Sequence, residues 1–383
     1  MNGQLELLAA SGIRAFESSF TALDAYFGLK SSSIRFGLAN CALQDLASVF
    51  DDIRYPGTHY ADAALPPRAL PEGGGNAGDD EGSALYLRCA DSAAEAESAA
   101  FAQLDLLRDP GRDVFLDPRG VYPSLREKIA VPRPAEPERQ LFESAVLASR
   151  YHYELDEARL PPAPRDFGVE AQRDLLTLML TGARPERGLE LLRKAGFVEA
   201  YWPELASLAG TVQSKDYHPE GDAWAHTLET FRHRKLPELG LSLALLLHDA
   251  GKPKASESEG RRFDRHAEIG RTVAERFMSR LGFSAPIMSE VSFLVRYHMM
   301  PAALPRLPAN RLEGVIDDPR FPILLELYRC DELSTFRGPD GYYEACAAYR
   351  VWLKNARNPW RGADGKKLVR MYVESTTGGR TPQ

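Results

Sequence analysis

The chain has 383 residues, of which 44% are hydrophobic and 26% charged, and its formal net charge is -7. This composition is that of an ordinary globular protein with two or three domains, each with a buried core. The negative charge excludes a surface that is basic throughout, so any contact with nucleic acid must be confined to a patch.

The cysteines and the N-terminal residues indicate a reducing compartment. The four cysteines are scattered without a CxxC pair, so we expect neither a disulfide framework nor a structural zinc site. The first residues lack the basic region and apolar core of a signal peptide, and the longest apolar run is too short to cross a bilayer. We therefore expect a cytoplasmic protein without a membrane partner.

Helical and strand-like patterns alternate in the first 130 residues. Residue alternation predicts strands at 33–38, 84–89, 101–107 and 114–116, and Asp109-Pro110-Gly111-Arg112 has the residues of a hairpin turn between the last two. Residues 65–83 are rich in Gly, Pro and acidic side chains, which predicts a loop. The first third of the chain is therefore expected to be a mixed α/β domain.

Three amphipathic segments follow, at 138–155, 169–180 and 187–195, and the last stops at Gly196 as a helix with a glycine cap would. Four basic side chains lie in or beside the third segment: Arg184, Arg187, Arg193 and Lys194. They would either face an RNA backbone or form a solvated helix face, and we favour the solvated face.

The sequence LSLALLLHDAGKP, at 241–253, is an apolar helical run that ends at adjacent His248 and Asp249. An imidazole beside a carboxylate can bring nitrogen and oxygen ligands to one metal ion, although such a pair can also simply cap a helix. Further candidates occur in segments that are predicted to be helical: His226, His266, His298 and Asp331. Their presence favours the metal site.

The order His, His-Asp, His, His, Asp resembles that of the HD-domain metal-dependent phosphohydrolases. This resemblance implies one divalent ion held by four residues of this pattern. It also implies a second metal position, which the Asp249 carboxylate could bridge to the first. We assign the first ion to His226, His248, Asp249 and Asp331, and the second position to His266 and His298. Mixed imidazole and carboxylate ligands suit manganese, iron, nickel, cobalt or zinc, whereas magnesium would bind more weakly.

Two residues of this segment are the candidate catalytic groups, Asp249 and Lys252. A metal centre of this kind activates water for attack on phosphorus, which predicts hydrolysis of a phosphomonoester or phosphodiester. Lys252 follows the ligand pair by one turn and could hold a phosphate oxygen, or it could satisfy carbonyls at the helix end. The sequence leaves these two roles of Lys252 open.

A second resemblance covers most of the chain. The phrases FAQLDLLRDPGRDVFLDPRG, PERGLELLRKAGFVEAYWPEL and HPEGDAWAHTLET resemble bacterial tRNA nucleotidyltransferases of the CCA-adding and poly(A) polymerase family. This family implies an α+β protein with a nucleotidyltransferase head, a helical neck and body, and in some members an HD domain. We expect a head at 1–130, a neck and body at 131–212, an HD domain at 213–345 and a basic tail at 346–383.

The head departs from the family pattern at each catalytic motif. The family holds two magnesium ions on alternating carboxylates after a glycine-rich turn, because phosphoryl transfer needs cations on the triphosphate. Alignment places the turn glycines on Ser19 and Phe20, the carboxylates on Ser33 and Arg35, the arginine-arginine-aspartate motif on Ser98, Ala99 and Ala100, and the base-selecting template on Ala135, Glu136 and Arg139. We therefore expect a catalytically inactive head.

The segment 350–370 alternates basic residues with Trp352 and Trp360. Such a segment can bind phosphates and stack bases, or it can dock as a helix through its tryptophans, which we favour. The expected function is a metal-dependent phosphohydrolase that acts on a nucleotide or an RNA-end phosphate, with tRNA or another RNA as a possible partner. The alternatives are an active tRNA nucleotidyltransferase and a noncatalytic RNA- or nucleotide-binding protein.

Overall fold

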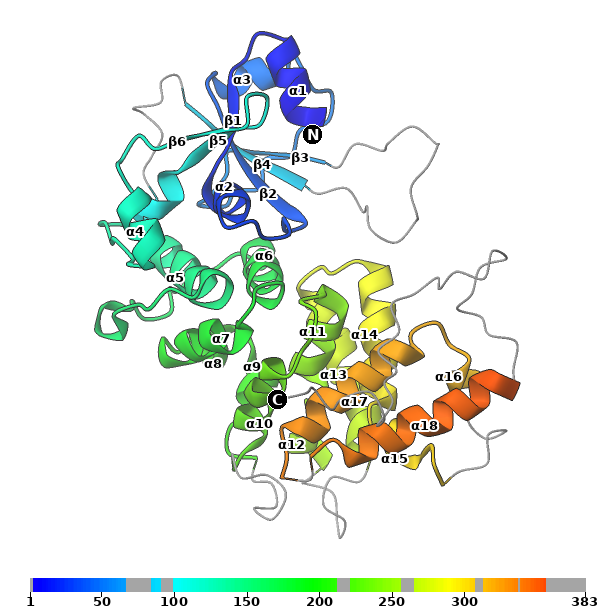
Figure 1. The fold of residues 1–383 in the computed structure, drawn as a ribbon. Helices are drawn as coiled ribbons and strands as arrows, with labels where there is room; N and C mark the ends of the chain where they lie inside the picture. Colours follow the sequence, from blue (N-terminus) through cyan, green and yellow to red (C-terminus); the bar gives the residue numbers. More distant parts are fainter. Residues whose placement is uncertain are drawn as a thin grey trace, which may run out of the picture. The chain divides into compact units, whose positions relative to one another are not determined.

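The computed structural model describes residues 3–66, 84–90, 99–211, 221–255, 265–306, 313–336 and 338–355. These residues form two compact units, Met1–Phe197 and Val198–Gln383. The first unit contains a six-stranded sheet, and the described part of the second is entirely helical (Figure 1). The expected α+β fold is therefore confirmed.

The sheet of the first unit has the strand order β3-β4-β2-β1-β5-β6. Its strands are β1 (Ala15–Glu17), β2 (Ile34–Ala39), β3 (Ala63–Leu65), β4 (Ala84–Cys89), β5 (Leu107–Asp109) and β6 (Val114–Leu116). The central strands β2 and β4 are parallel, and every other pair is antiparallel. The sheet is therefore mixed, with its parallel pair covered on both faces, as parallel strands require.

Side chains of β2 point alternately to the two faces of the sheet. One face packs against α1 (Gly3–Ala10) and α3 (Leu43–Leu46) through Leu85, Leu87 and their neighbours. On this face Gly37 is required, because a Cβ there would lie 2.8 Å from Leu87 Cδ2 and 3.2 Å from the Phe16 carbonyl oxygen. The opposite face carries Phe36, whose ring packs edge-on against Phe20 of α2 (Ser19–Tyr26).

The predicted strand at 101–107 is wrong over most of its length. Ala102–Asp105 form a 3-10 helix, η1, and β5 begins at Leu107. The reason is the fully buried Gln103, whose side chain donates to Ile129 O and accepts from Val131 N at 3.2 Å. This side chain takes the pairing role that a strand backbone would have. Strand β4 matches its predicted range, and β2 is shifted by one residue.

The helical part of the first unit comprises α4 (Tyr122–Glu127), α5 (Pro137–Tyr151), η2 (Glu157–Arg159), α6 (Val169–Leu180) and α7 (Pro185–Lys194). A buried ion pair joins α5 to α2: Arg150 Nε lies 2.7 Å from Asp24 Oδ1, and Arg150 Nη2 lies 2.8 Å from Oδ2. This bidentate geometry fixes the angle between the two helices. The predicted range of α6 is confirmed in full.

Three of the basic side chains near α7 pair with acidic ones. The pairs are Arg184 with Glu186, Arg187 with Glu154, and Lys194 with Glu157. Their charges are thus paired within the first unit.

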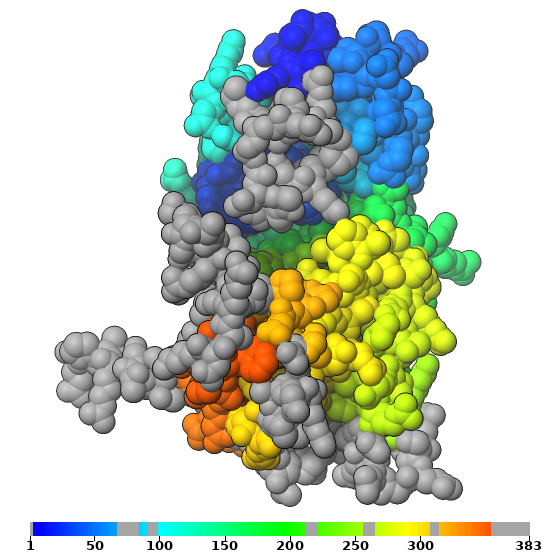
Figure 2. Space-filling view, turned by 90° about the vertical axis from the view of Figure 1, so that its right-hand side faces the viewer, coloured from blue at the N-terminus to red at the C-terminus, as the bar shows by residue number. Residues whose placement is uncertain are grey.

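The second unit surrounds one apolar helix, α11 (Leu239–Leu247), whose residues from Gly240 onward are all buried. Its other helices are α9 (Pro203–Ala206), α10 (Ala223–Arg232), α12 (Lys252–Ala255), α13 (His266–Arg280), α14 (Ala285–Tyr297), α15 (Met300–Ala303), α16 (Glu313–Ile316), α17 (Phe321–Leu333) and α18 (Asp340–Asn355), with α8 (Phe197–Tyr201) at the boundary between the units. Helices α10, α14 and α17 contact α11 directly. Figure 2 shows the yellow and orange segments of this unit forming one continuous surface.

The described part of α18 docks through a tryptophan, because Trp352 Nε1 donates to Asp317 Oδ1 at 2.8 Å. The rest of the predicted basic tail, with Trp360, lies outside the described residues. Within the described ranges, no helix combines the length and the apolar character that a bilayer span needs.

Candidate metal centre

The six predicted ligands come together in the second unit from helices that are far apart in sequence. His226 lies in α10, whose N-terminus is capped by Asp222, which accepts from Ala225 N at 2.8 Å. His248 and Asp249 follow the end of α11, and His298 follows the end of α14. The remaining two open α13 and lie near the end of α17: His266 and Asp331.

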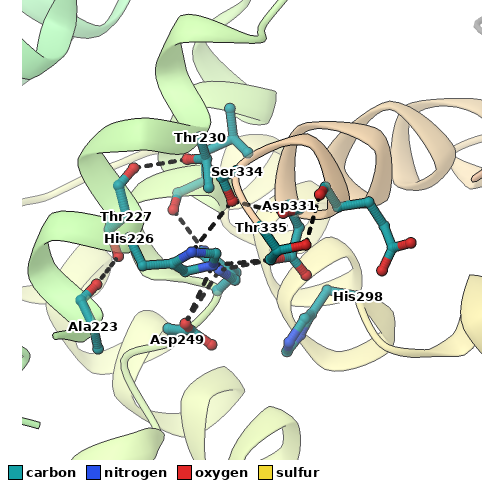
Figure 3. Close-up of polar contacts among 12 residues, drawn as sticks. Ala223, His226, Thr227, Thr230, Asp249, His298, Asp331, Ser334 and Thr335 are labelled. Atoms are coloured by element: carbon teal, nitrogen blue, oxygen red, sulfur yellow. Dashed lines mark hydrogen bonds and ion pairs between the residues drawn. The ribbon is translucent and has the colours of Figure 1, made fainter. Parts of the chain in front are cut away.

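One triad consists of His226, His248 and Asp331, whose ligand atoms all lie within 4.8 Å of one another. The His226 Nε2 atom is 2.9 Å from Asp331 Oδ1, and His248 Nε2 is 4.0 Å from the same oxygen. Both imidazoles are essentially inaccessible to solvent. Figure 3 shows His226 with Asp331 on one side and Asp249 on the other.

A second triad consists of Asp249, His266 and His298, again with ligand atoms within 4.8 Å of one another. The Nε2 atoms of His266 and His298 are only 3.0 Å apart. At this distance the two nitrogens either share a hydrogen bond, with one ring donating its proton, or have a cation between them.

The Asp249 carboxylate lies between the triads. Its Oδ2 is 3.4 Å from His248 Nε2 and 3.9 Å from His226 Nε2, whereas its Oδ1 is 3.9 Å from His266 Nε2. Each oxygen thus faces a different group of imidazoles. This is the arrangement that a bridging carboxylate between two metal positions would need.

Hydrogen bonds at Nδ1 hold three of the imidazoles with Nε2 toward the cluster. His248 Nδ1 donates to Leu245 O and His298 Nδ1 donates to Val295 O, both at 2.8 Å. These carbonyls lie one turn back in the same helix, so the orientation follows from each histidine's place at a helix end. The bonds select the tautomer whose Nε2 lone pair can bind a metal.

The third orienting partner is Ser334, which sequence reasoning missed. Its hydroxyl donates to Asp331 O at 2.6 Å, so its oxygen is left to accept from His226 Nδ1 at 3.2 Å (Figure 3). One serine therefore couples the orientation of His226 to the end of the helix that carries Asp331. No local motif marks this residue, because its partner lies more than a hundred positions earlier.

The electrostatics of the cluster suit metal ligation. Burial, together with His266 and His248, lowers the pKa of His298 to about 3, so this imidazole is neutral at physiological pH. Burial acts against the charges of Asp249 and Asp331, but neighbouring imidazoles, and Lys252 in the case of Asp249, outweigh it and lower both carboxyl pKa values. Neutral imidazole and ionised carboxylate are the ligand forms that divalent metals bind.

An unsatisfied atom supplies an independent test of this fit. His248 Nε2 is buried and makes no hydrogen bond with any residue that the structure describes. A buried acceptor without a partner costs free energy unless a ligand completes it. The donor set and this orphaned nitrogen together fit a divalent transition-metal ion.

Lys252 lies beside the centre, with its Nζ 2.6 Å from Asp249 Oδ2. This contact is an ion pair without good hydrogen-bond geometry, and the lysine is 8% exposed. The ammonium group is thus close enough to act at the centre. His218 of the sequence HPEGD lies outside the described residues.

Gly251 is a further residue whose importance the sequence did not reveal. A Cβ at this position would lie 2.0 Å from the carbonyl oxygen of His266 and 2.5 Å from the backbone nitrogen of Gly270. The loop after Asp249 therefore approaches the start of α13 at backbone distance. This approach places His266 beside Asp249, and it tolerates no side chain.

The first unit has a cavity of about 370 Å³ at the place of the expected nucleotidyltransferase site. Ser19, aligned with a family glycine, has a φ of 52°, a left-handed value that glycine adopts without strain. On β2, Phe36 and Leu38 line the cavity, whereas Arg35 lies on the opposite face and pairs with Glu17. Alternation along the strand thus turns Arg35, which the alignment set at a family carboxylate, away from the cavity.

The other motif positions of the first unit are distributed as follows. Ala99 and Arg139 line the cavity, and Glu136 precedes the first turn of α5. Ser98 lies outside the described residues. The side chains of Phe36 and Leu38, which line the cavity from β2, cannot bind a metal.

The helical fold and the two triads indicate a helical domain with a metal centre, and comparison with known families agrees with this class. Residues 224–318 match the HD domain family. The second unit therefore contains an HD domain, as the sequence predicted. The matched range includes all the candidate ligands except Asp331, which follows it on α17.

The wider relationship is with tRNA nucleotidyltransferases. The chain is 37% identical over 194 residues to the CC-adding tRNA nucleotidyltransferase of Thermus thermophilus, a match that covers 49% of this chain and 44% of the relative. It is 35% identical over 190 residues to the multifunctional CCA protein of Halorhodospira halophila, covering 48% and 46%. The chain thus carries an HD domain and is related to this family, although each match spans less than half of the relative's length.

Solved structures of CCA-adding enzymes overlap most of the chain at low similarity. The enzyme of Thermotoga maritima in complex with tRNA is 10% identical, with a TM-score of 0.40, over 92% of this chain and 82% of that one. The enzyme of Bacillus stearothermophilus in complex with CTP is 14% identical, also with a TM-score of 0.40, over 92% and 98%. A TM-score of this size is too low for an inference about this chain.

Proposed function

We propose that the protein is a metal-dependent phosphohydrolase whose activity resides in the HD domain. The observation that carries the proposal is the pair of triads joined by the two oxygens of Asp249. In this proposal His226, His248 and Asp331 would hold one divalent ion, His266 and His298 would hold a second, and Asp249 would contribute to both positions. Manganese, iron, nickel, cobalt or zinc suits these ligands best.

The metal ions would supply Lewis acidity and a bound water of lowered pKa. The protein's own side chains supply position and charge. The Nδ1 hydrogen bonds orient the imidazoles, and Asp249 stays ionised beside Lys252. Lys252 Nζ is the candidate partner for a phosphate oxygen of the substrate, since it lies 2.6 Å from Asp249 Oδ2 at the centre.

The substrate class that we propose is a phosphodiester or phosphomonoester of a nucleotide or of an RNA end. Two metal positions bridged by a carboxylate favour phosphodiester chemistry, because both the attacking and the leaving oxygen can be stabilised. The relationship to tRNA nucleotidyltransferases supports an RNA or nucleotide substrate. The tRNA itself would be the natural macromolecular partner.

We propose in addition that the first unit does not transfer nucleotides. Support comes from β2, where Phe36 and Leu38 face the cavity in place of carboxylates. An active nucleotidyltransferase remains the second candidate, because the named relatives are CC- and CCA-adding enzymes. Incorporation of labelled CTP or ATP into a tRNA without its CCA end would favour this second candidate and contradict an inactive head.

The test of the main proposal is metal analysis of the purified chain, followed by a hydrolysis screen. The substrates are 2′,3′-cyclic nucleotides, mononucleotides and bis- and mono-p-nitrophenyl phosphates, each with the candidate metals. We expect hydrolysis to be lost in His248→Ala. It should be retained in the matched control His233→Ala, because His233 lies at the C-terminal end of α10 and outside both triads. Binding of RNA or nucleotide without hydrolysis by any metal form would instead indicate a noncatalytic binding protein.

A further inference from the structure

Two of the four cysteines meet at the end of the parallel strand pair in the first unit, and both are free thiols. Cys89 is the last residue of β4, and Cys41 follows the last residue of β2 by two positions. The register places Ala39 of β2 opposite Cys89, and Ala90 N donates to Ala39 O at 3.0 Å. The strands thus stay paired to their ends, and this pairing brings together two cysteines that are far apart in the sequence.

The two thiols are in contact on one face of the sheet. Cys41 belongs to the apolar cluster between the sheet and helices α1 and α3, and Cys89 packs against the same cluster. The thiol of Cys41 is a hydrogen-bond partner of the Cys89 thiol. Cys41 is 8% exposed, whereas Cys89 is half-buried and therefore the more accessible of the two to a small molecule. Thiols in hydrogen-bond contact are already near the separation that a disulfide requires.

Hydrogen bonds hold the backbone on both sides of this pair. Cys89 N donates to Asp62 Oδ2 at 2.9 Å. Ala42, which follows Cys41, donates its backbone N–H to Asp45 Oδ2 at 2.9 Å. The two side chains are thus presented to each other by a locally fixed backbone, which lowers the entropy cost of joining them.

The surroundings favour a bond between the sulfurs over a bound metal. The carboxylates that act on the pair, Asp45 and Asp62, already accept backbone hydrogen bonds. Among the residues that the structure describes, both groups of side chains that could hold a metal lie in the second unit and contain no cysteine. Two thiols without further ligands do not complete a tetrahedral zinc or iron site. Oxidation to a disulfide is the chemistry that two adjacent thiols can carry out by themselves with a small oxidant.

We propose that Cys41 and Cys89 form a disulfide by exchange with a small-molecule disulfide, and that this bond clamps the paired ends of β2 and β4. The Cys89 thiolate attacks one sulfur of the small disulfide, which forms a mixed disulfide and releases one small thiolate. The Cys41 thiolate then attacks the Cys89 sulfur, and the second small thiolate leaves. Two protein thiols are oxidised, the small disulfide is reduced to two thiols, and these take up the two protons that the cysteines lose.

The environment of the pair sets the rate of this reaction. Burial, the Cys41 thiol and Asp62 raise the pKa of Cys89 to about 12, so little thiolate is present at neutral pH and the first attack is slow. Once formed, the disulfide is favoured by the fold, because the fold holds the two sulfurs together in any case. We therefore expect a bond that accumulates under lasting oxidising conditions.

The test is redox equilibration of the full chain in buffers with set ratios of oxidised to reduced glutathione. Free thiols are then alkylated, and mass spectrometry of the peptides identifies the linked pair. We expect one peptide pair, joined through Cys41 and Cys89. The other two cysteines are buried in the second unit and should stay reduced: Cys330 and Cys346. Absence of this peptide pair at every glutathione ratio would overturn the proposal.

The same equilibration in urea measures what the fold contributes. The Cys41–Cys89 bond should be favoured about a hundredfold more in the folded chain than in the unfolded chain, because only folding holds the thiols in contact. An equal preference in both states would contradict the proposed contact.

Variants assign the order of attack. In Cys41→Ala the exposed partner is left alone, so glutathione should remain on Cys89 as a mixed disulfide. In Cys89→Ala only the buried Cys41 remains, and about tenfold less adduct should form. Cys330→Ala is the matched control and should form the bond as the unchanged chain does. If both first-unit variants lose as many free thiols as the unchanged chain while remaining folded by circular dichroism, the bond lies elsewhere and the proposal fails.

Thermal unfolding tests whether the bond acts as a clamp. A disulfide that closes a long loop restricts the unfolded chain, so the first unit of the oxidised chain should unfold at a temperature about 5 °C higher or more. Reduction should reverse the shift, and Cys41→Ala should show none. An unchanged or lower unfolding temperature of the linked chain would contradict the clamp.

Discussion

The HD centre and the cavity of the first unit both gather buried polar side chains, but their charges have opposite consequences. In the HD centre, Asp249 and Asp331 stay ionised because imidazoles and Lys252 surround them. In the cavity, Glu143 keeps its proton because burial outweighs the nearby arginine. Ionised carboxylates with neutral imidazoles suit a cation, whereas a protonated carboxyl does not.

The two sites thus differ in which side chains they present: imidazoles and carboxylates in the HD centre, and apolar side chains of β2 in the cavity. The difference between the two sites depends on which side chains the local backbone turns toward each site. At helix ends of the HD domain, successive ligands point to one place, whereas β2 turns Phe36 and Leu38 into the cavity. Four variants would break or sharpen this contrast.

The largest effect is expected for Asp249→Asn, which keeps the side-chain shape and removes the charge between the triads. Loss of the bridging carboxylate should lower hydrolysis by about 10³-fold or more and reduce the metal bound per chain. The measurements are kcat/KM on the best substrate of the screen and metal content by elemental analysis. Unchanged activity would show that the observed hydrolysis came from a contaminant or from another site.

The next effect is expected for Gly251→Ala. Its new Cβ would collide with the His266 carbonyl oxygen, so α13 must shift, at a cost of about 1–3 kcal/mol in the free energy of unfolding. Urea denaturation measures this loss, and metal analysis should show weaker binding because His266 moves. Gly314→Ala is the control, since nothing lies within 4 Å of a Cβ there. Equal stability of both variants would contradict the close approach.

A smaller effect is expected for Ser334→Ala, which removes the acceptor at His226 Nδ1. Orienting partners of this kind change metal affinity by about tenfold to a hundredfold. Competition with a chelator measures the affinity, and Ser334→Thr should restore most of it by keeping the hydroxyl. If Ser334→Ala binds metal as the unchanged protein does, the orientation of His226 has another cause.

The smallest effect is expected in the first unit, for Glu143→Gln. The raised pKa of Glu143 means that the folded state keeps a proton that the unfolded state releases as pH rises through the ordinary carboxyl pKa. Stability of the first unit should therefore fall between about pH 4.5 and pH 8 and then level off. Glu143→Gln removes this slope. Thermal unfolding at pH 5 and pH 8 measures it, and identical slopes would show that Glu143 ionises normally.

Much of the HD domain could be predicted from the sequence, because the relevant signals are local. The apolar run before His248 predicted a buried helix ending at the ligand pair. The six ligand types and their order were likewise visible in the chain. The strand β4 and the helix α6 followed from alternation and helical spacing within each segment.

What only the tertiary structure decided depends on contacts between distant residues. Asp331 reaches His226 across 105 positions, and the convergence of the six side chains follows from how α10, α11, α13, α14 and α17 pack. Gly251 and Ser334 matter only because another element approaches them. The sequence by itself determined which groups could bind a cation, and the packing determined where each would point. Side-chain chemistry belongs to single residues, whereas convergence is a property of the whole fold.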